Sequence, residues 1–378
     1  MSRHLHQGST AIAAALLVLA TGCAGDPEVA PQQPGGSPTS EESPTEENTQ
    51  GTAGPEPALL DWQRAGDSPM DRRIVGAEWT ALAARQGGSV TLTRDDQEVV
   101  VPAGGARRVS DVLMDDDWAV VVASDETGRT EPAVTATAVD LDTGETYPIE
   151  QPPPGPGPWA MHDGHVLYGT YDPGGAYCLA EVTLAPAGRA ESQPGDFTGY
   201  CAEERHGFSG LTTSEHGLAM MTFDDRRPAS CRTLGLLDLD AEDGGGATFT
   251  PMPEVPECTG RDVAATATGA IWSTVADERR QEEGRFFALH DGDVVDLGPG
   301  TTGTLVPCGD SAYFTADPRG AGDPARLMRW TSDGILETVY ETRGKGQAFL
   351  APPDCVGHVL TLSAFAEGGD EQVYAEVP

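Results

Sequence analysis

The feature that most constrains the fold of this chain is a repeated pattern, in which a turn residue precedes a strand of alternating apolar side chains. Copies of the pattern lie 41–53 residues apart and begin at Asp117, Gly164, Gly217, Gly269, Asp310 and Gly357. Each copy is followed by a polar loop and a second strand, and then in most cases by a turn and a third strand. A less regular strand usually precedes it. The repeating unit is therefore four short strands, which is more than a single hairpin and contains no helix.

Four strands per 40–50 residues, with turns at a fixed phase, predict an all-β fold, a β-propeller. A partial copy at 79–102 brings the number of four-stranded blades to seven. The last copy reaches Pro378 without a fourth strand, and residues near Leu59–Gln63 could supply it. N- and C-terminal strands would then close the ring and remove its exposed edges. The alternatives are a β-sandwich or solenoid of similar period, or a ring of six or eight blades.

The cysteines agree with this phase. Six remain when Cys23 is set aside, and six cysteines in an exported domain favour disulfides, for which 15 pairings are possible. Matching positions in the repeat predict the pairs Cys178–Cys201, Cys231–Cys258 and Cys308–Cys355. We expect each bridge to contribute about 3 kcal/mol, mainly by restricting the unfolded chain.

The N-terminus has the pattern of an exported precursor: Arg3 near the start, an apolar stretch over 11–20, and small residues before Cys23. The run Ala20-Thr21-Gly22-Cys23 resembles the lipobox of bacterial lipoproteins, which implies that Cys23 carries the lipid and becomes the mature N-terminus. The alternative is an ordinary secretory signal. The apolar stretch is too short for a bilayer span, which needs roughly 20 residues. We therefore predict three parts: a signal peptide at 1–23, a Pro/Ser/Glu-rich disordered tether at 24–57, and the propeller at 58–378.

Charge narrows the possible partners. The formal net charge is −37, so the surface should repel nucleic acid. The charge is explained by solubility or salt tolerance, or alternatively by recruitment of a cationic partner or metal ions.

The sequence matches known catalytic and metal-binding motifs only weakly. The segment 238–249 departs from a calcium loop, and 124–131 departs from the Asp-box of sialidase-type propellers. His162 and His165 flank a turn and could form a metal pair, although an ordinary turn between two strands explains them. We expect the aromatic residues of the repeated strands to pack between blades; they are Trp118, Tyr168, Phe223, Trp272 and Tyr313. The sequence thus predicts no catalytic, cofactor-binding or metal-binding residue.

The whole pattern resembles the lipid-anchored propeller proteins of bacteria, with TolB-like or WD40-like blades, and the composition suggests an actinobacterial source. The resemblance implies a monomer, exported and attached by lipid on Cys23 to the outer face of the cell membrane. We predict a non-catalytic binding or scaffold propeller that recognises a protein or cell-envelope component. The alternatives are a propeller enzyme acting on a glycan or another extracellular substrate, and a transporter's substrate-binding lipoprotein. An enzyme should gather two or more carboxylates or histidines at one end of the channel, with apolar walls around them. A binding module should show a broad face without such a cluster.

Overall fold

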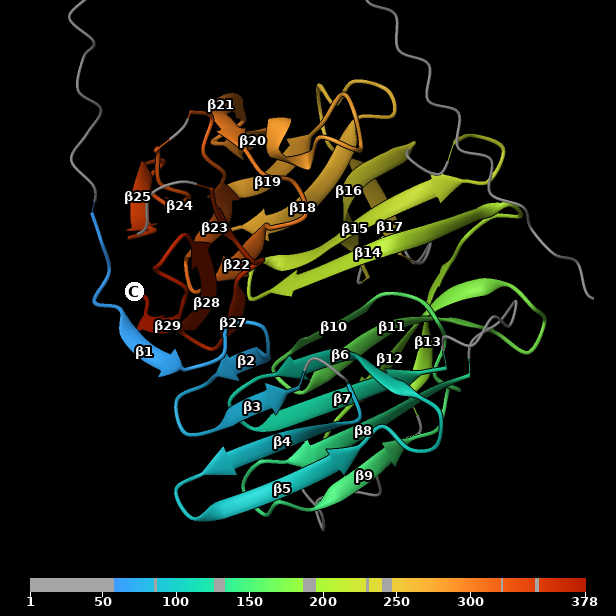
Figure 1. Cartoon of the computed structure of the whole chain (residues 1–378). Coiled ribbons are helices and arrows are strands. Elements are labelled where there is room, and N and C mark those ends of the chain that lie inside the picture. Colours follow the sequence, from blue (N-terminus) through green and yellow to red (C-terminus); the bar gives the residue numbers. More distant parts are fainter. Residues whose placement is uncertain are drawn as a thin grey trace, which may run out of the picture. The chain divides into compact units, whose positions relative to one another are not determined.

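Seven antiparallel sheets, which we call blades 1 to 7, follow one another along the described part of the chain and stand in a ring (Figure 1). In a computed structural model of the protein, the described residues are 58–84, 87–125, 133–185, 195–228, 231–239, 247–320, 322–343 and 347–378. All of them belong to one unit that spans Ala53–Pro378. The predicted signal peptide, Cys23 and the tether lie outside the described residues.

The strands of the first four blades are as follows. Blade 1 contains β2 (Arg72–Val75), β3 (Thr80–Ala83), β4 (Ser89–Arg94) and β5 (Gln97–Pro102). Blade 2 contains β6 (Arg108–Met114), β7 (Trp118–Ser124), β8 (Val134–Asp140) and β9 (Thr146–Ile149). Blade 3 contains β10 (Trp159–His162), β11 (His165–Tyr171), β12 (Tyr177–Thr183) and β13 (Asp196–Cys201). Blade 4 contains β14 (His206–Ser214), β15 (Gly217–Asp224), β16 (Arg232–Asp238) and β17 (Thr248–Pro251).

The remaining blades follow the same order. Blade 5 contains β18 (Gly260–Thr266), β19 (Gly269–Thr274), β20 (Gly284–His290) and β21 (Asp293–Gly300), with the short helix η1 (Gln281–Glu283) before β20. Blade 6 contains β22 (Val306–Cys308), β23 (Ser311–Ala316), β24 (Arg326–Trp330) and β25 (Leu336–Glu341). Blade 7 contains β26 (Ala348–Leu350), β27 (Asp354–Val356), β28 (Val359–Ala366), β29 (Glu371–Glu376) and, from the start of the domain, β1 (Gln63–Gly66).

The repeated strand of the sequence is the second strand of blades 2 to 7, which confirms the phase of the repeat. This strand is the most buried part of a blade: six of the seven residues of β7 (Trp118–Ser124) are buried. Blades pack face to face, so both faces of a middle strand are shielded from solvent. Residues such as Val, Ala and Trp therefore suit it on both faces.

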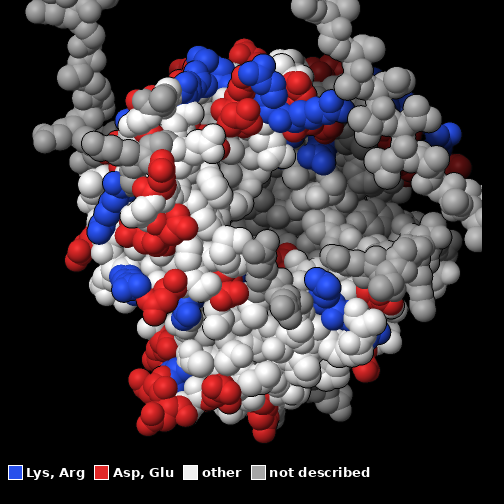
Figure 2. All heavy atoms as spheres, in the orientation of Figure 1, with Lys and Arg blue, Asp and Glu red and all other residues white. Residues whose placement is uncertain are grey.

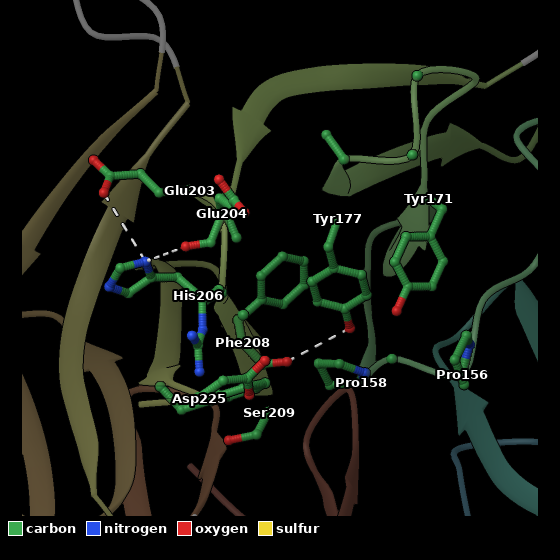
Figure 3. Close-up of a pocket in the computed structure, with 18 residues that line it drawn as sticks. Pro156, Pro158, Tyr171, Tyr177, Glu203, Glu204, His206, Phe208, Ser209 and Asp225 are labelled. Atoms are coloured by element: carbon green, nitrogen blue, oxygen red, sulfur yellow. Dashed lines mark hydrogen bonds and ion pairs between the residues drawn. The ribbon is translucent and has the colours of Figure 1, made fainter. Parts of the chain in front are cut away.

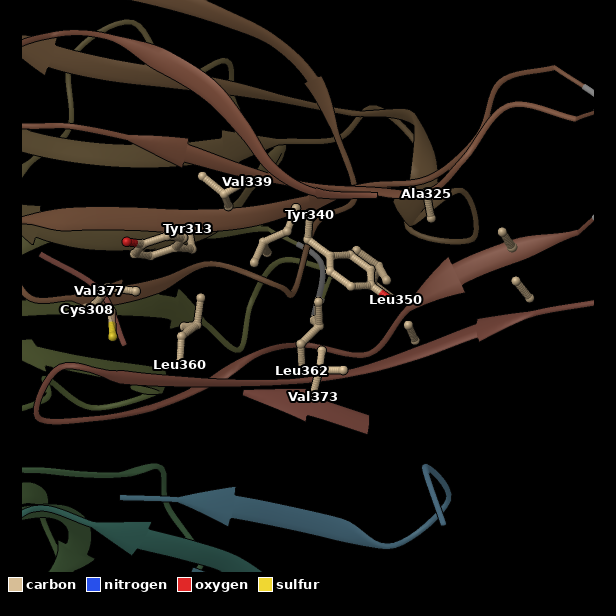
Figure 4. Packing of buried hydrophobic residues seen from close by; sticks show 14 residues of the cluster. Cys308, Tyr313, Ala325, Val339, Tyr340, Leu350, Leu360, Leu362, Val373 and Val377 are labelled. Carbon is tan, nitrogen blue, oxygen red and sulfur yellow. The ribbon is translucent and has the colours of Figure 1, made fainter. Parts of the chain in front are cut away.

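The ring is closed by pairing of β1 with β29, in which Gln63 lies opposite Tyr374. The sequence placed the closing strand near Leu59–Gln63, and the structure places it at Gln63–Gly66. The shift has a physical cause, because Leu60 and Trp62 pack against the core cluster between blades 6 and 7 instead of forming the ladder. Trp62 donates a hydrogen bond from Nε1 to the Val339 carbonyl at 2.8 Å. Figure 4 shows this cluster, in which Tyr340 and Leu362 are labelled.

Polar contacts tie neighbouring blades together near the inner strands. The backbone N–H of Val75 in blade 1 donates to Thr361 Oγ1 in blade 7 at 2.9 Å. The guanidinium of Arg72 pairs with Asp111 of blade 2 at 2.9 Å and with Asp354 of blade 7 at 2.8 Å. One side chain thus joins three consecutive inner strands across the point where the ring closes.

The six domain cysteines form three disulfides: Cys178–Cys201, Cys231–Cys258 and Cys308–Cys355. This is the pairing that the repeat predicts. The first two lie at the same end of blades 3 and 4, and the third joins the inner strands of blades 6 and 7. Among the described residues, no helix is long and apolar enough to cross a membrane.

Candidate functional site

A pocket of about 980 Å³ opens between blades 3 and 4. The surface is hollowed between these two blades in Figure 2, and Figure 3 shows the pocket from close by. Its lining comes from four segments: 156–158 before β10, 171–177 between β11 and β12, 202–209 leading into β14, and 223–225 at the end of β15. Loops of two adjacent blades therefore build one site at one end of the strands. Such loops are where propellers commonly bind ligands.

Aromatic rings form the wall of this pocket. The Tyr171 and Tyr177 ring centroids lie 5.3 Å apart, and those of Tyr177 and Phe208 lie 4.5 Å apart. Phe223 also lines the pocket, from the end of β15. Tyr171 is 48% exposed, so the outermost ring offers an open face to a ligand. Stacking and cation–π contacts both need such an accessible face.

Glycines on neighbouring segments allow Tyr177 to occupy its position. A Cβ placed on Gly157 or on Gly169 would collide with the Tyr177 hydroxyl. The adjacent residue, Cys178, is bonded to Cys201 at the end of β13. The aromatic wall is therefore fixed by close backbone packing on one side and by a disulfide on the other. Burial also raises the pKa of Tyr177, so its hydroxyl stays neutral at ordinary pH.

Carboxylates line the pocket from two places: the connection between β13 and β14, and the residue that follows β15. Glu203, Glu204 and Asp225 line it, and the Glu203 side chain is 89% exposed. Arg205 adopts a left-handed φ of 67°, and the His206 N–H donates to the Glu203 carbonyl at 2.9 Å. This tight turn places both glutamates beside the aromatic wall. The pocket therefore combines aromatic rings with three carboxylates and one guanidinium, that of Arg205, so its lining is negative on balance.

His206 is held by contacts with both of its ring nitrogens. Nδ1 lies 3.2 Å from the Glu204 carbonyl, and Nε2 lies 3.1 Å from Arg226 Nη2. A neutral imidazole that donates from Nδ1 and accepts at Nε2 satisfies both contacts. Arg226 in turn pairs with Asp224 at 2.8 Å, and its hydrogen bonds lower the pKa of Asp224 to about 2. With its acceptor nitrogen already occupied, His206 is not placed to remove a proton from a substrate.

A second hollow, of about 360 Å³, lies where the turns between first and second strands of blades 2, 3, 4, 6 and 7 converge. We call it the channel mouth. Its polar lining includes Asp115, His162, Glu215 and His358. Asp115 is engaged in structure, because its carboxylate accepts the N–H groups of Trp118 at 2.7 Å and Gly164 at 2.8 Å, and burial raises its pKa. Carboxylates and histidines thus do gather at this end of the channel, in surroundings that are mixed rather than apolar.

The two histidines that the sequence offered as a possible metal pair lie at an ordinary turn. His162 and His165 are opposite each other at the start of a two-residue turn, where Asp163 and Gly164 have φ of 49° and 72°. His165 hydrogen-bonds Glu181 at 2.7 Å, which supports the interpretation as an ordinary turn. Cys23, residues 240–246 of the calcium-like loop and 126–131 of the Asp-box-like segment lie outside the described residues.

The predicted packing of aromatic residues between blades is correct for four of the five. Those four are almost fully buried: Trp118, Tyr168, Trp272 and Tyr313. Phe223 is an exception, because it lies near the end of β15 and lines the pocket instead. The remaining pocket residues were missed by sequence reasoning. The available signal was the pair Glu203-Glu204 next to Cys201, on the connection between two blades, with tyrosines at both ends of the loop 171–177.

Comparisons with known proteins concern the fold. No family model and no curated protein matches this sequence. Among solved structures, the chain is similar to the β-propeller domain of the Trilobed protease from Pyrococcus furiosus, with a TM-score of 0.54 and 10% identity over 81% of this chain and 95% of that one. It also matches an acylaminoacyl peptidase (TM-score 0.49, 10% identity, 71% of this chain and 46% of that chain) and a Trypanosoma rangeli sialidase (0.42, 11%, 82% and 59%).

Identity this low shows the fold alone. The strand order, the ring and the first of these likenesses define the protein as a seven-bladed β-propeller. Propellers serve many unrelated functions, so the function has to be argued from the site.

Proposed function

We propose that this protein is a binding propeller of the cell envelope, attached by lipid on Cys23 to the outer face of the membrane. The pocket between blades 3 and 4 is its recognition site. It takes a segment of a protein partner that carries a positive charge next to an apolar or aromatic side chain.

One observation carries this proposal: three carboxylates line the same pocket as the wall of aromatic rings, against a single cation, Arg205. The carboxylates are Glu203, Glu204 and Asp225. A lysine or arginine side chain is attracted both by carboxylates and by the face of a tyrosine ring. The chain's net charge of −37 would also steer a basic partner toward the protein. Exposed aromatic residues fixed by packing are the residue type that contributes most to binding at protein interfaces.

A propeller enzyme that acts on a glycan is the second candidate. The same observation favours it, since glycosidases use pairs of carboxylates and sugars stack on aromatic rings. Both ring nitrogens of His206 already have partners, which favours binding over catalysis.

The test is a binding titration with a labelled peptide that alternates lysine and tryptophan, and with a matched peptide that alternates glutamate and tryptophan. We expect the basic peptide to bind, and Tyr171→Ala or the double change Glu203→Gln/Glu204→Gln to weaken it by about tenfold or more. Affinity should fall as salt is added, because part of it is electrostatic.

Matched controls are Phe349→Ala, another exposed aromatic residue, and Glu98→Gln, an exposed glutamate of blade 1. Neither should change affinity. Equal binding of the acidic peptide, or equal losses in the control variants, would contradict a cation-selective pocket. Hydrolysis of a glycan that the double glutamate change abolishes would promote the enzyme instead.

A further inference from the structure

Two tight turns from different blades meet at the channel mouth. Glu215 and His216 join β14 to β15, and the flanking residues Ser214 and Gly217 pair with each other. Gly309 and Asp310 join β22 to β23 in the same way, with Cys308 opposite Ser311. Each turn therefore contains only two residues, so the side chains it carries have little freedom of position.

Three side chains of these turns bring their ligand atoms together. An imidazole nitrogen of His216 and one carboxylate oxygen each from Glu215 and Asp310 all lie within 4.8 Å of one another. His216 Nε2 is 3.6 Å from Glu215 Oε1 and 3.9 Å from Asp310 Oδ1, which is too far for a hydrogen bond. Two ligands bound tetrahedrally to one ion at about 2.1 Å would be about 3.4 Å apart, so small adjustments bring all three onto one ion.

The Nε2 atom of His216 is available to bind a metal ion. Its Nε2 atom is inaccessible to solvent and has no hydrogen-bond partner in the described structure. A buried polar atom without a partner is unfavourable, and natural proteins rarely leave one. A cation between His216 and the two carboxylates would satisfy the nitrogen and compensate both negative charges.

The turns are also held rigidly before any ion binds. Thr213 donates to the Met161 carbonyl of blade 3 at 3.0 Å, and Ser214 donates to the Ala265 carbonyl of blade 5 at 3.3 Å. The turn of blade 6 is tied to blade 7 by the disulfide Cys308–Cys355. Ligands on such fixed supports lose little entropy on binding, which favours affinity and selectivity.

We propose that Glu215, His216 and Asp310 form a site for one divalent transition-metal ion of the Zn²⁺ class, which bridges blades 4 and 6. One imidazole and two carboxylates suit Zn²⁺, whereas Ca²⁺ and Mg²⁺ prefer ligand sets made of oxygen alone. Three protein ligands would leave a fourth coordination position of a tetrahedral ion for water or another ligand. This site does not depend on the pocket between blades 3 and 4, which is made by loops at the other end of the strands.

The experiment is calorimetric titration of the full chain, purified without a histidine tag, with Zn²⁺ and separately with Ca²⁺. We expect one Zn²⁺ per chain and no comparable binding of Ca²⁺. His216→Ala and Asp310→Asn should each weaken Zn²⁺ binding by at least about tenfold. Affinity should also fall as the pH is lowered, because protons compete with the metal for the imidazole.

His165→Ala is the matched control, since this histidine lies at the turn of blade 3 but is engaged with Glu181. It should leave Zn²⁺ affinity unchanged, and circular dichroism of each variant should match the parent protein. Unchanged affinity in Asp310→Asn would show that blade 6 contributes no ligand and would overturn the bridging site. Absence of Zn²⁺ binding, or equal loss in His165→Ala, would overturn the site as a whole.

Discussion

Individual carboxylates of this acidic protein have different roles, set by what each one contacts. Asp262 of blade 5 is half-buried and accepts the N–H of Gly303, on the connection to blade 6, at 2.9 Å; desolvation raises its pKa. Asp224 lies instead beside Arg226, whose hydrogen bonds lower its pKa from 3.8 to about 2. The first joins blades, and the second orients the arginine that contacts His206 in the pocket. The same residue type therefore has opposite pH behaviour at the two places.

Asp224 gives a prediction about stability and pH. A carboxylate with a lowered pKa contributes stability that is present above its unfolded pKa and is lost as the pH falls through its folded pKa. For Asp224 this window runs from 3.8 down to about 2. We therefore expect Asp224→Asn to lower Tm at pH 6, and the difference from the parent protein to disappear near pH 2. Calorimetric scans at both pH values check this, and a difference of the same size at both would contradict it.

At the scale of elements, closure of the ring depends on a short strand and on the residues that lead into it. β26 and β27 both pair with β28, so β1 takes the fourth and outermost strand position of blade 7. Just before β1, Trp62 packs edge-on against Tyr340, with ring centroids 5.3 Å apart. A propeller whose first and last strands separate would expose ladder edges that invite aggregation. The contacts of Trp62 therefore support closure as directly as the ladder itself.

Replacing this tryptophan tests its contribution. We expect Trp62→Ala to lower the free energy of unfolding by about 2 kcal/mol, less than a fully buried tryptophan would, because Trp62 is only half-buried. Leu59→Ala is the matched control, since Leu59 is 57% exposed and should change stability by less than about 0.5 kcal/mol. Urea titration measures both. Equal losses in the two variants would mean that the Trp62 contacts do not stabilise the closed ring.

At the scale of the whole molecule, the two open ends of the ring carry different chemistry. The pocket between blades 3 and 4 has aromatic rings beside carboxylates, whereas the channel mouth has histidines and carboxylates on tight turns. Both sites are compatible with a protein displayed on a membrane surface, where a partner can approach either end. This display depends on the proposed lipid anchor on Cys23.

The anchor is tested in a bacterial host that processes lipoproteins. We expect Cys23→Ser to release the protein into the medium or leave it unprocessed, because one or more acyl chains would no longer hold it. Fractionation with a labelled fatty acid measures the change, and Cys355→Ser serves as the control cysteine variant, which should remain in the membrane fraction. A processed, fatty-acid-labelled Cys23→Ser protein in the membrane would contradict the proposal.

The sequence by itself determined the features that local chemistry encodes. Turn residues and alternating strands repeat at Asp117, Gly164 and the later copies, so four-stranded blades and their phase follow from a local pattern. The sequence favoured seven blades over six or eight, and the structure confirms seven. The disulfide pairs follow as well, because Cys178 and Cys231 have the same phase within the repeat. The closing strand was placed a few residues too early, because no local signal shows that Trp62 enters the core rather than the ladder.

Only the tertiary structure decided where the sites are. Tyr171 and Glu203 meet in one pocket because two blades stand side by side, and Phe223 lines it because β15 ends beside the pocket. Glu215 and His216 lie far along the chain from Asp310, and the ring brings their turns together. Local propensity carries no information about which loops of a closed ring converge. That information comes from the packing of one blade against the next.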